Sequence, residues 1–211
     1  MKDSPNLNIH PLALVEDNVS IAASAYIGAF SVIGARPEHR SHHNNEDLVH
    51  GVVVKSRVVV REGVLIQQGT FVSTVVEEDA FIMGNTTIGH DSFIGYSSTI
   101  GPGCHIAGNS HLSPQVTLGM GTAIHQGSRL GRLVMTSMNS VVKGPVAPFL
   151  LLVGPSGMVA GANTVGIQRL GLGEGWIDDY LENLDDVFNG LVPASLPEEV
   201  KNIIREWQTL L

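Results

Sequence analysis

Residues 82–100 read IMGNTTIGHDSFIGYSSTI, and an aliphatic residue returns at every sixth position of this stretch. The stripe continues beyond it, and a small or β-branched residue stands two places before each member, so chance does not explain the repeat. The full stripe is Ile82, Ile88, Ile94, Ile100, Ile106, Leu112, Leu118, Ile124, Leu130, Thr136 and Val142. Earlier blocks of the same period are Ile9, Val15, Ile21, Ile27 and Ile33, and then Val54, Val60, Ile66 and Val72.

A period of six fits neither an α-helix nor a long strand, but it fits short extended segments that turn a corner every six residues. Three segments close a triangle of eighteen residues, and successive coils stack about 4.8 Å apart. Glycine often follows the aliphatic residue, as at Gly89 and Gly95, as expected where the backbone bends without a Cβ. The sequence therefore predicts an all-β fold with a small α appendage, a parallel β-helix of roughly seven coils over residues 9–145.

Breaks in the repeat divide the chain. We expect residues 1–150 to form the β-helix, with a polar, aperiodic loop extruded at 36–51 and a four-residue phase shift between Val72 and Val76. Residues 151–172 are predicted to connect it to a helical region at 173–211. That region has one helical pattern over 176–188 and a second opened by a cap at Ser195.

Composition excludes several classes of function. The chain has 211 residues, 43% of them hydrophobic, and a net charge of −8, which argues against nucleic-acid binding. No window of eighteen apolar residues suggests a membrane span, so we expect a cytoplasmic protein without stable membrane insertion. The single cysteine, Cys104, permits neither an internal disulfide nor a cysteine metal cage, and it falls in the inward small-residue stripe.

Histidines mark where chemistry could lie. Stacking by eighteen places His90, Gly108 and Gln126 above one another, and the same strip carries Asn109 and His125. His90 and His125 are thirty-five residues apart, one short of two coils, which puts them about 10 Å apart near one edge.

Other histidines carry less information. We expect His105 and His111 to be ordinary surface residues. A cluster in the extruded loop lacks the carboxylate or cysteine pattern of a metal site, so we predict no metal there. Its members are His39, His42, His43 and His50.

Several motifs occur in order along nearly the whole chain. They are Ile33-Gly-Ala-Arg-Pro37, the stretch from Val60 to Thr70, Ile88-Gly-His-Asp91, Leu118 to Gln126, and Ala160 to Gly171. In this order the chain resembles the UDP-N-acetylglucosamine O-acyltransferases of lipid A biosynthesis, members of the hexapeptide-repeat acyltransferases. The resemblance implies that the β-helix is left-handed, and that the protein is a homotrimer with active sites between subunits.

The resemblance also implies roles for single residues. His90 would be the general base that deprotonates an acceptor hydroxyl as it attacks a phosphopantetheine thioester, and the Gly108 N–H would meet the oxyanion. Residues implied to bind substrate are Asp91, Asn109, His125, Gln126, Met138, Asn163 and Arg169. Adjacency alone does not show that Asp91 orients His90, because neighbours on an extended strand face opposite ways.

The implied substrates are a nucleotide-linked sugar and an acyl thioester, with no bound cofactor. Met138 matches a position that lines the acyl groove, so we expect a short or medium chain. The expected donor is acyl carrier protein or coenzyme A. Coenzyme A is a serious alternative because the acidic C-terminal region would repel an acidic carrier protein. The chain departs from the family pattern at Thr87 and Asn109, where the family has histidines, and at His39 and Leu170.

Two other readings remain open from the residues. A γ-class carbonic anhydrase shares the repeat but needs three converging imidazoles for zinc, and Gln126 stands where the second coil would supply one. A non-catalytic β-helix scaffold would leave His90 without a function. The sequence does not name the acceptor, the acyl length, or whether oxygen or nitrogen is acylated.

Overall fold

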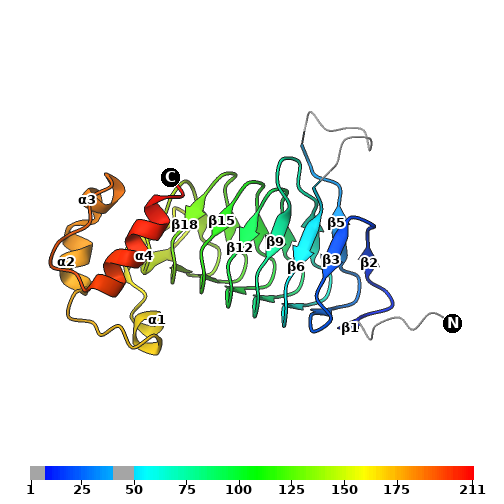
Figure 1. The fold of residues 1–211 in the computed structure, drawn as a ribbon, viewed down its shortest axis with the longest axis horizontal. Coiled ribbons are helices and arrows are strands. Elements are labelled where there is room, and N and C mark those ends of the chain that lie inside the picture. Colours follow the sequence, from blue (N-terminus) through cyan, green and yellow to red (C-terminus); the bar gives the residue numbers. More distant parts are fainter. Residues whose placement is uncertain (1–7, 40–49) are drawn as a thin grey trace.

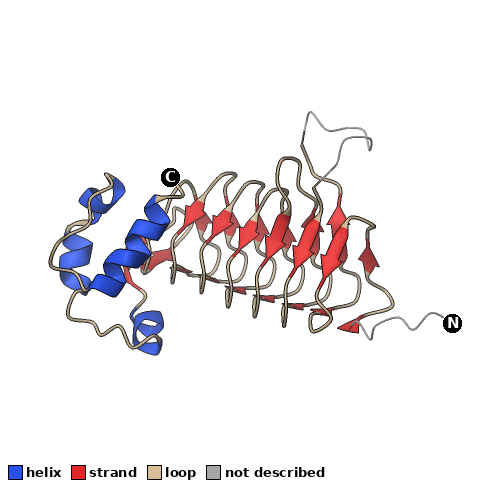
Figure 2. Cartoon of the chain, viewed as in Figure 1, coloured by secondary structure: helices blue, strands red, loops and turns tan. Residues whose placement is uncertain are grey.

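The computed structural model describes residues 8–39 and 50–211, which form a row of stacked coils with helices at one end (Figure 1). The coils make a parallel β-helix of about eight turns, so the predicted fold class is confirmed with about one coil more than expected. Figure 2 shows the strands aligned in rows along the stack and the helices gathered beyond the last coil.

Three sheets form the walls of the β-helix. Sheet A contains β1 (Asn8–Ile9), β4 (Tyr26–Ile27), β7 (Val59–Val60), β10 (Phe81–Ile82), β13 (Thr99–Ile100), β16 (Thr117–Leu118), β19 (Met135–Thr136), β21 (Leu150–Val153) and β22 (Met158–Ala162). Sheet B contains β2 (Leu14–Val15), β5 (Val32–Ala35), β8 (Leu65–Gln67), β11 (Thr87–Ile88), β14 (His105–Ile106), β17 (Ala123–Ile124) and β20 (Val141–Val142). Sheet C contains β3 (Val19–Ile21), β6 (Val52–Val54), β9 (Thr74–Val76), β12 (Phe93–Ile94), β15 (His111–Leu112) and β18 (Arg129–Leu130).

The aliphatic stripe fills the interior. Strands eighteen residues apart pair in register, for example Ile88 with Ile106 and Ile106 with Ile124, and these side chains are buried. The small residues two places earlier are buried as well, and their hydroxyls donate to corner carbonyls, as Ser110 does to Ala107 at 2.6 Å. Cys104 belongs to this inner stripe and is fully buried.

The corners need glycine for a reason other than bending. A Cβ on Gly89 would lie 2.6 Å from the Gly108 nitrogen of the next coil, so this glycine allows close approach of the coils. The left-handed backbone position falls two residues later, at Asp91 (φ 58°) and Asn109 (φ 56°). Asparagine and aspartate tolerate that conformation better than most residues, so polar side chains recur at the corners.

The phase shift near Val72 is a loop between β8 and β9. Val76, not Val72, occupies the buried position in the wall and pairs with Ile94, whereas Val72 is 55% exposed. Including Val72 in the aliphatic stripe was therefore wrong: residues 68–73 leave the wall, and we call them the Asp91 loop after the residue they enclose.

The C-terminal end closes the stack. Within 151–172, the expected connection, β21 extends sheet A, β22 pairs with β21 antiparallel, and α1 (Thr164–Arg169) follows. The region beyond contains α2 (Ile177–Glu182), α3 (Leu184–Phe188) and α4 (Glu198–Gln208). The pattern over 176–188 is thus two helices, separated at Asn183. The predicted Ser195 cap is wrong, because Pro197 occupies the N-cap of α4 and Ser195 bonds to Asp179 instead.

Aromatic packing joins the helices to the last coils. Phe149, Trp176 and Tyr180 contact one another edge to face, and the Tyr180 hydroxyl donates to the Pro148 carbonyl at 2.6 Å. Within 8–39 and 50–211, no helix has the length and apolar character needed to cross a bilayer.

Candidate active site

His90 and Asp91 form the corner between β11 of sheet B and β12 of sheet C. Because Asp91 adopts a left-handed conformation (φ 58°), the two neighbours do not face opposite ways as they would on an extended strand. Asp91 Oδ2 lies 2.6 Å from His90 Nδ1, and both side chains are buried. The structure therefore shows the contact that adjacency in sequence could not establish.

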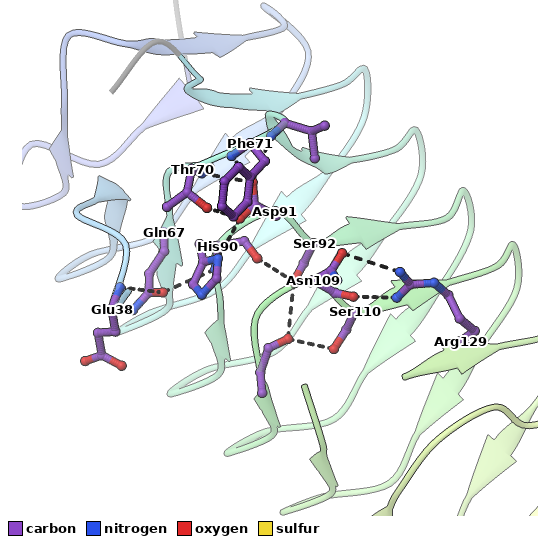
Figure 3. A network of polar contacts seen from close by, with 12 residues as sticks. Glu38, Gln67, Thr70, Phe71, His90, Asp91, Ser92, Asn109, Ser110 and Arg129 are labelled. Atoms are coloured by element: carbon purple, nitrogen blue, oxygen red, sulfur yellow. Dashed lines mark hydrogen bonds and ion pairs between the residues drawn. The ribbon is translucent and has the colours of Figure 1, made fainter. Parts of the chain in front are cut away.

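The Asp91 loop encloses the carboxylate (Figure 3). The backbone N–H groups of Thr70, Phe71 and Val72 donate to Oδ1 at 2.9, 2.7 and 2.8 Å, and the Thr70 hydroxyl donates to Oδ2. Burial opposes ionisation, but the hydrogen bonds from Thr70, Val72, His90 and Phe71 outweigh it and lower the pKa of Asp91 to about 2. Asp91 was expected to bind substrate, yet its oxygens are occupied by groups of its own chain.

An ionised Asp91 fixes the tautomer of His90. A carboxylate only accepts hydrogen bonds, so His90 Nδ1 carries the proton that it donates, and Nε2 keeps a lone pair. The His90 backbone N–H donates to Gln67 Oε1 at 3.2 Å, and the same oxygen accepts from the Glu38 N–H at 3.4 Å. In this arrangement Nε2 is the atom that can accept a proton from a neighbouring group.

Nε2 faces Gly108 on the next coil. A Cβ built on Gly108 would lie 2.5 Å from Nε2, so the imidazole packs directly against the glycine. The Asn109 N–H donates to the His90 carbonyl at 2.7 Å, and the Gly108 carbonyl accepts from Gly127 at 3.1 Å. The Gly108 N–H itself has no acceptor among residues 8–39 and 50–211, which leaves a free donor beside the base.

A pocket of about 360 Å³ opens on sheet B beside His90. Glu38, Gln67, Gly108 and Gln126 line it, so the predicted stack of His90, Gly108 and Gln126 is present. His105, expected to be an ordinary surface residue, lines it too, in register beside Thr87.

Two members of the predicted strip point elsewhere. Asn109 lines a neighbouring pocket on the sheet C side and contacts Arg129. His125 is exposed, and its Nδ1 lies 3.1 Å from the Gln126 carbonyl oxygen. Both stay near the same corner, but within this chain neither contacts His90 through its side chain.

Asn163 and Arg169 lie on a different face. They line a pocket of about 350 Å³ between α1 and sheet A, together with Thr117 and Met135. The Asn163 side chain caps α1 by accepting from Gly166 at 3.1 Å and donates to the Leu133 carbonyl at 2.8 Å, so both ends of its amide are used in the fold. Arg169 is exposed in the last turn of α1.

Met138 occupies the corner between sheets A and B and is 62% exposed. Met120 lies one coil earlier at the same corner, and the Asn139 N–H donates to its carbonyl. The expected site residues thus fall into three places on one chain: the His90 corner, the methionine corner, and the pocket under α1.

The remaining histidines differ among themselves. His111 stacks on Phe93 with ring centroids 4.5 Å apart, and burial followed by the charge of Arg129 lowers the pKa of His111 to about 4. His39 meets His90 edge to face at 5.4 Å, while His50 pairs with Gly69. His42 and His43 lie outside the described residues. Within 8–39 and 50–211, no three His, Cys, Asp or Glu side chains converge as a metal site requires.

Sequence reasoning missed the partners of Asp91 and the role of Gln67. Their signal was present in the phase shift between Val72 and Val76, since four extra residues in a regular wall must leave it somewhere. The repeat gave no means of predicting which corner they would cover.

Comparisons with known proteins find relatives among acyltransferases. No protein-family model matches the chain. The chain is 27% identical over 205 residues to an acyl-[acyl-carrier-protein]–UDP-N-acetylglucosamine O-acyltransferase of Rhizobium johnstonii, which covers 96% of the chain and 74% of that protein. It is 31% identical to the protein of the same name from Rhizobium rhizogenes, over 90% of the chain and 69% of that protein.

Solved structures share the architecture. A UDP-N-acetylglucosamine acyltransferase from Bacteroides fragilis superposes with a TM-score of 0.76 at 20% identity, over 95% of this chain and 76% of the other. The enzyme from Francisella novicida gives 0.68 at 24% identity, over 95% and 86%. These two structures support the β-helix followed by helices.

Proposed function

Because the chain belongs to the acyl-[acyl-carrier-protein]–UDP-N-acetylglucosamine O-acyltransferase family, we propose that it transfers an acyl group from an acyl carrier thioester to a hydroxyl of UDP-N-acetylglucosamine. The protein is an acyltransferase of this type. One observation supports placing the active centre here: Asp91 holds His90 Nδ1 while Nε2 faces Gly108, whose N–H has no acceptor among the described residues.

The proposed reaction uses these groups in sequence. His90 Nε2 takes the proton of the acceptor hydroxyl as its oxygen attacks the thioester carbonyl carbon. The carbonyl oxygen becomes an oxyanion that accepts from the Gly108 N–H. Its collapse re-forms the C=O bond and expels the thiolate, which takes the proton back from His90. Asp91 stabilises the imidazolium between the two transfers and does not touch substrate.

The donor in this proposal is acyl carrier protein, as in the names of the relatives. The phosphopantetheine arm is common to acyl carrier protein and coenzyme A, so a test must offer both. The acidic residues of α2 and α3 remain the reason to compare them, because like charges slow the encounter of two acidic proteins.

We also propose that the active unit is a homotrimer. Asn163 and Arg169, at the two ends of α1, line the pocket between α1 and sheet A, whereas the pocket beside His90 opens on sheet B. The two pockets are on separate walls of one β-helix, so a single site that uses both needs two subunits. Cyclic packing of sheet A of one subunit near sheet B of the next would supply three such sites.

The test follows thiol release from acyl carrier protein and acyl-CoA donors with UDP-N-acetylglucosamine as acceptor. His90→Ala should reduce turnover by about 10²–10⁴-fold, the usual contribution of a general base. His10→Ala, on the first coil, is the matched histidine control and should retain activity. Full activity of His90→Ala would reject the mechanism. If the wild type releases thiol from neither donor, the proposed function is rejected.

A further inference from the structure

Arg129 binds oxygens of two corner turns at once. Its Nη1 donates to the carbonyl of Asn109, to that of Gly127 at 3.1 Å and to that of Ser128 at 3.3 Å. Its Nη2 lies 3.4 Å from Asn109 Oδ1. Figure 3 shows the guanidinium reaching from sheet C to Asn109, beside the corner that holds His90.

The turn that Arg129 holds, residues 107–110, carries the Gly108 N–H. Gly108 has no Cβ and can adopt many backbone conformations, so the direction of its N–H depends on what restrains its neighbours. Ser110 Oγ donates to the Ala107 carbonyl on one side at 2.6 Å. On the other side, Asn109 is held by its N–H to His90 and by Arg129 at both its backbone and side-chain oxygens.

The fold does not require a cation at this place. The same outward row of sheet C holds Phe93 and His111 in the two preceding coils, and Arg129 pairs in register with His111. No carboxylate of residues 8–39 and 50–211 forms an ion pair with Arg129. An unneutralised positive charge is thus fixed to the turn on which an oxyanion would form.

We propose that Arg129 is a positioning residue of the acyl-transfer site. It holds the turn of residues 107–110 so that the Gly108 N–H faces the developing oxyanion beside His90 Nε2. This inference rests on the proposed function. It differs from substrate binding, because every hydrogen bond of the guanidinium goes to the protein's own turns.

The first test compares Arg129→Met with Arg129→Lys in the full-length protein. Methionine keeps the length and the apolar contacts but removes the donors, so kcat should fall about tenfold, a fraction of the effect of deleting an oxyanion donor outright. The KM values for donor and acceptor should stay within about twofold, since the turn contributes in the transition state. Lysine should restore part of kcat, and added guanidinium ion should raise the kcat of Arg129→Ala.

Arg132→Met is the matched control. Arg132 lies three residues further along and bonds to Gln115 Oε1 at 2.8 Å, away from the turn of residues 107–110. Its kcat should remain near that of the wild type. Comparable losses in both methionine variants, or a kcat for Arg129→Met within about twofold of the wild type, would overturn the inference.

The outcomes separate this inference from the proposed function. If the wild type transfers acyl groups in a His90-dependent way and Arg129→Met is fully active, only the positioning role is rejected. An increase in KM at unchanged kcat would show that Arg129 binds substrate and would also reject it. Failure of the wild type to release thiol would reject both.

Discussion

Asp91 organises the candidate site more than any other single residue. Asp91 Oδ1 accepts hydrogen bonds from three backbone N–H groups of the Asp91 loop, and Oδ2 accepts from the Thr70 hydroxyl and from His90 Nδ1. A buried carboxylate with this many donors remains ionised across the physiological range. The charge of Asp91 is therefore both a restraint on the loop and the acceptor that holds the Nδ1 proton of His90.

Replacing Asp91 with asparagine should lower stability at neutral pH. The pKa of Asp91 falls from 3.8 to about 2 on folding, so its ionised form contributes about 2 kcal/mol to the free energy of unfolding above about pH 4. That contribution is lost as the pH falls from about 4 to about 2. Urea unfolding at several pH values should show a difference between wild type and Asp91→Asn that shrinks across this window.

Asp79→Asn is the control for that experiment. Asp79 has the same left-handed backbone (φ 59°) but pairs with Arg57 in solvent, so its replacement should change stability little. A gap for Asp91→Asn that stays constant down to pH 2 would contradict the assignment of the lowered pKa.

Met138 should limit the acyl chain. Its side chain stands at the corner between sheets A and B, and removal of its bulk in Met138→Gly would lengthen any groove that it closes. We expect the preferred acyl chain to become longer, measured by kcat/KM over a series of donors. Met158→Ala, at a similarly exposed methionine on β22, should leave the optimum unchanged. An unchanged optimum in Met138→Gly would exclude this role.

At the scale of elements, the Asp91 loop is the feature that turns a structural corner into a candidate active site. It departs from the wall for residues 68–73 and returns at β9 with the register intact. Gly69 permits its path, because a Cβ there would lie 1.6 Å from the Val72 carbonyl oxygen. The loop therefore cannot keep its shape with a larger residue at this position.

Gly69→Ala should impair activity through Asp91. The displaced loop would withdraw its N–H donors and leave the carboxylate partly unsatisfied, at a cost of about 1–3 kcal/mol. Thiol release should fall at least about tenfold, since a general base without its orienting partner loses much of its contribution. Gly103→Ala is the control: nothing lies within 4 Å of its Cβ, and its φ of 66° should cost about 1 kcal/mol of stability without changing turnover.

The elements were predictable to different degrees. The sixfold stripe predicted the walls because identical coils bury identical positions, as at Ile88, Ile106 and Ile124. His90 stood out because the His-Asp pair occurs in only this copy of the repeat. Contacts of the Asp91 loop were not predictable, because they join residues about twenty apart through an insertion without a period. The contacts of Arg129 were not predictable from the repeat either, and Asn163 gave no sign that its amide caps α1.

At the scale of the whole molecule, the site residues are divided between walls. The pocket beside His90 opens on sheet B, whereas Arg169, in the last turn of α1, lines the pocket between α1 and sheet A. The coils between β11 and β20 are paired in register, so within one chain the two pockets stay on separate walls. In the proposed homotrimer, association of subunits would bring the two pockets together.

Subunit mixing should test this arrangement. His90→Ala and Arg169→Ala homotrimers should each be weakly active. Unfolding and refolding them together in equal amounts should restore up to about a quarter of wild-type activity, because random assembly pairs the two intact residues at about that fraction of interfaces. Mixtures that stay as inactive as their parents, with mixed trimers demonstrated by mass, would contradict a shared site.

The regular stack also sets a unit of length for the molecule. Each coil adds one strand spacing of about 4.8 Å, so any groove running along the axis can grow only by that step when a whole coil is inserted. A finer adjustment has to come from the volume of a single corner side chain. The length of such a groove can therefore change in two ways: by whole coils, or in smaller steps through one corner side chain, which is the role we propose for Met138.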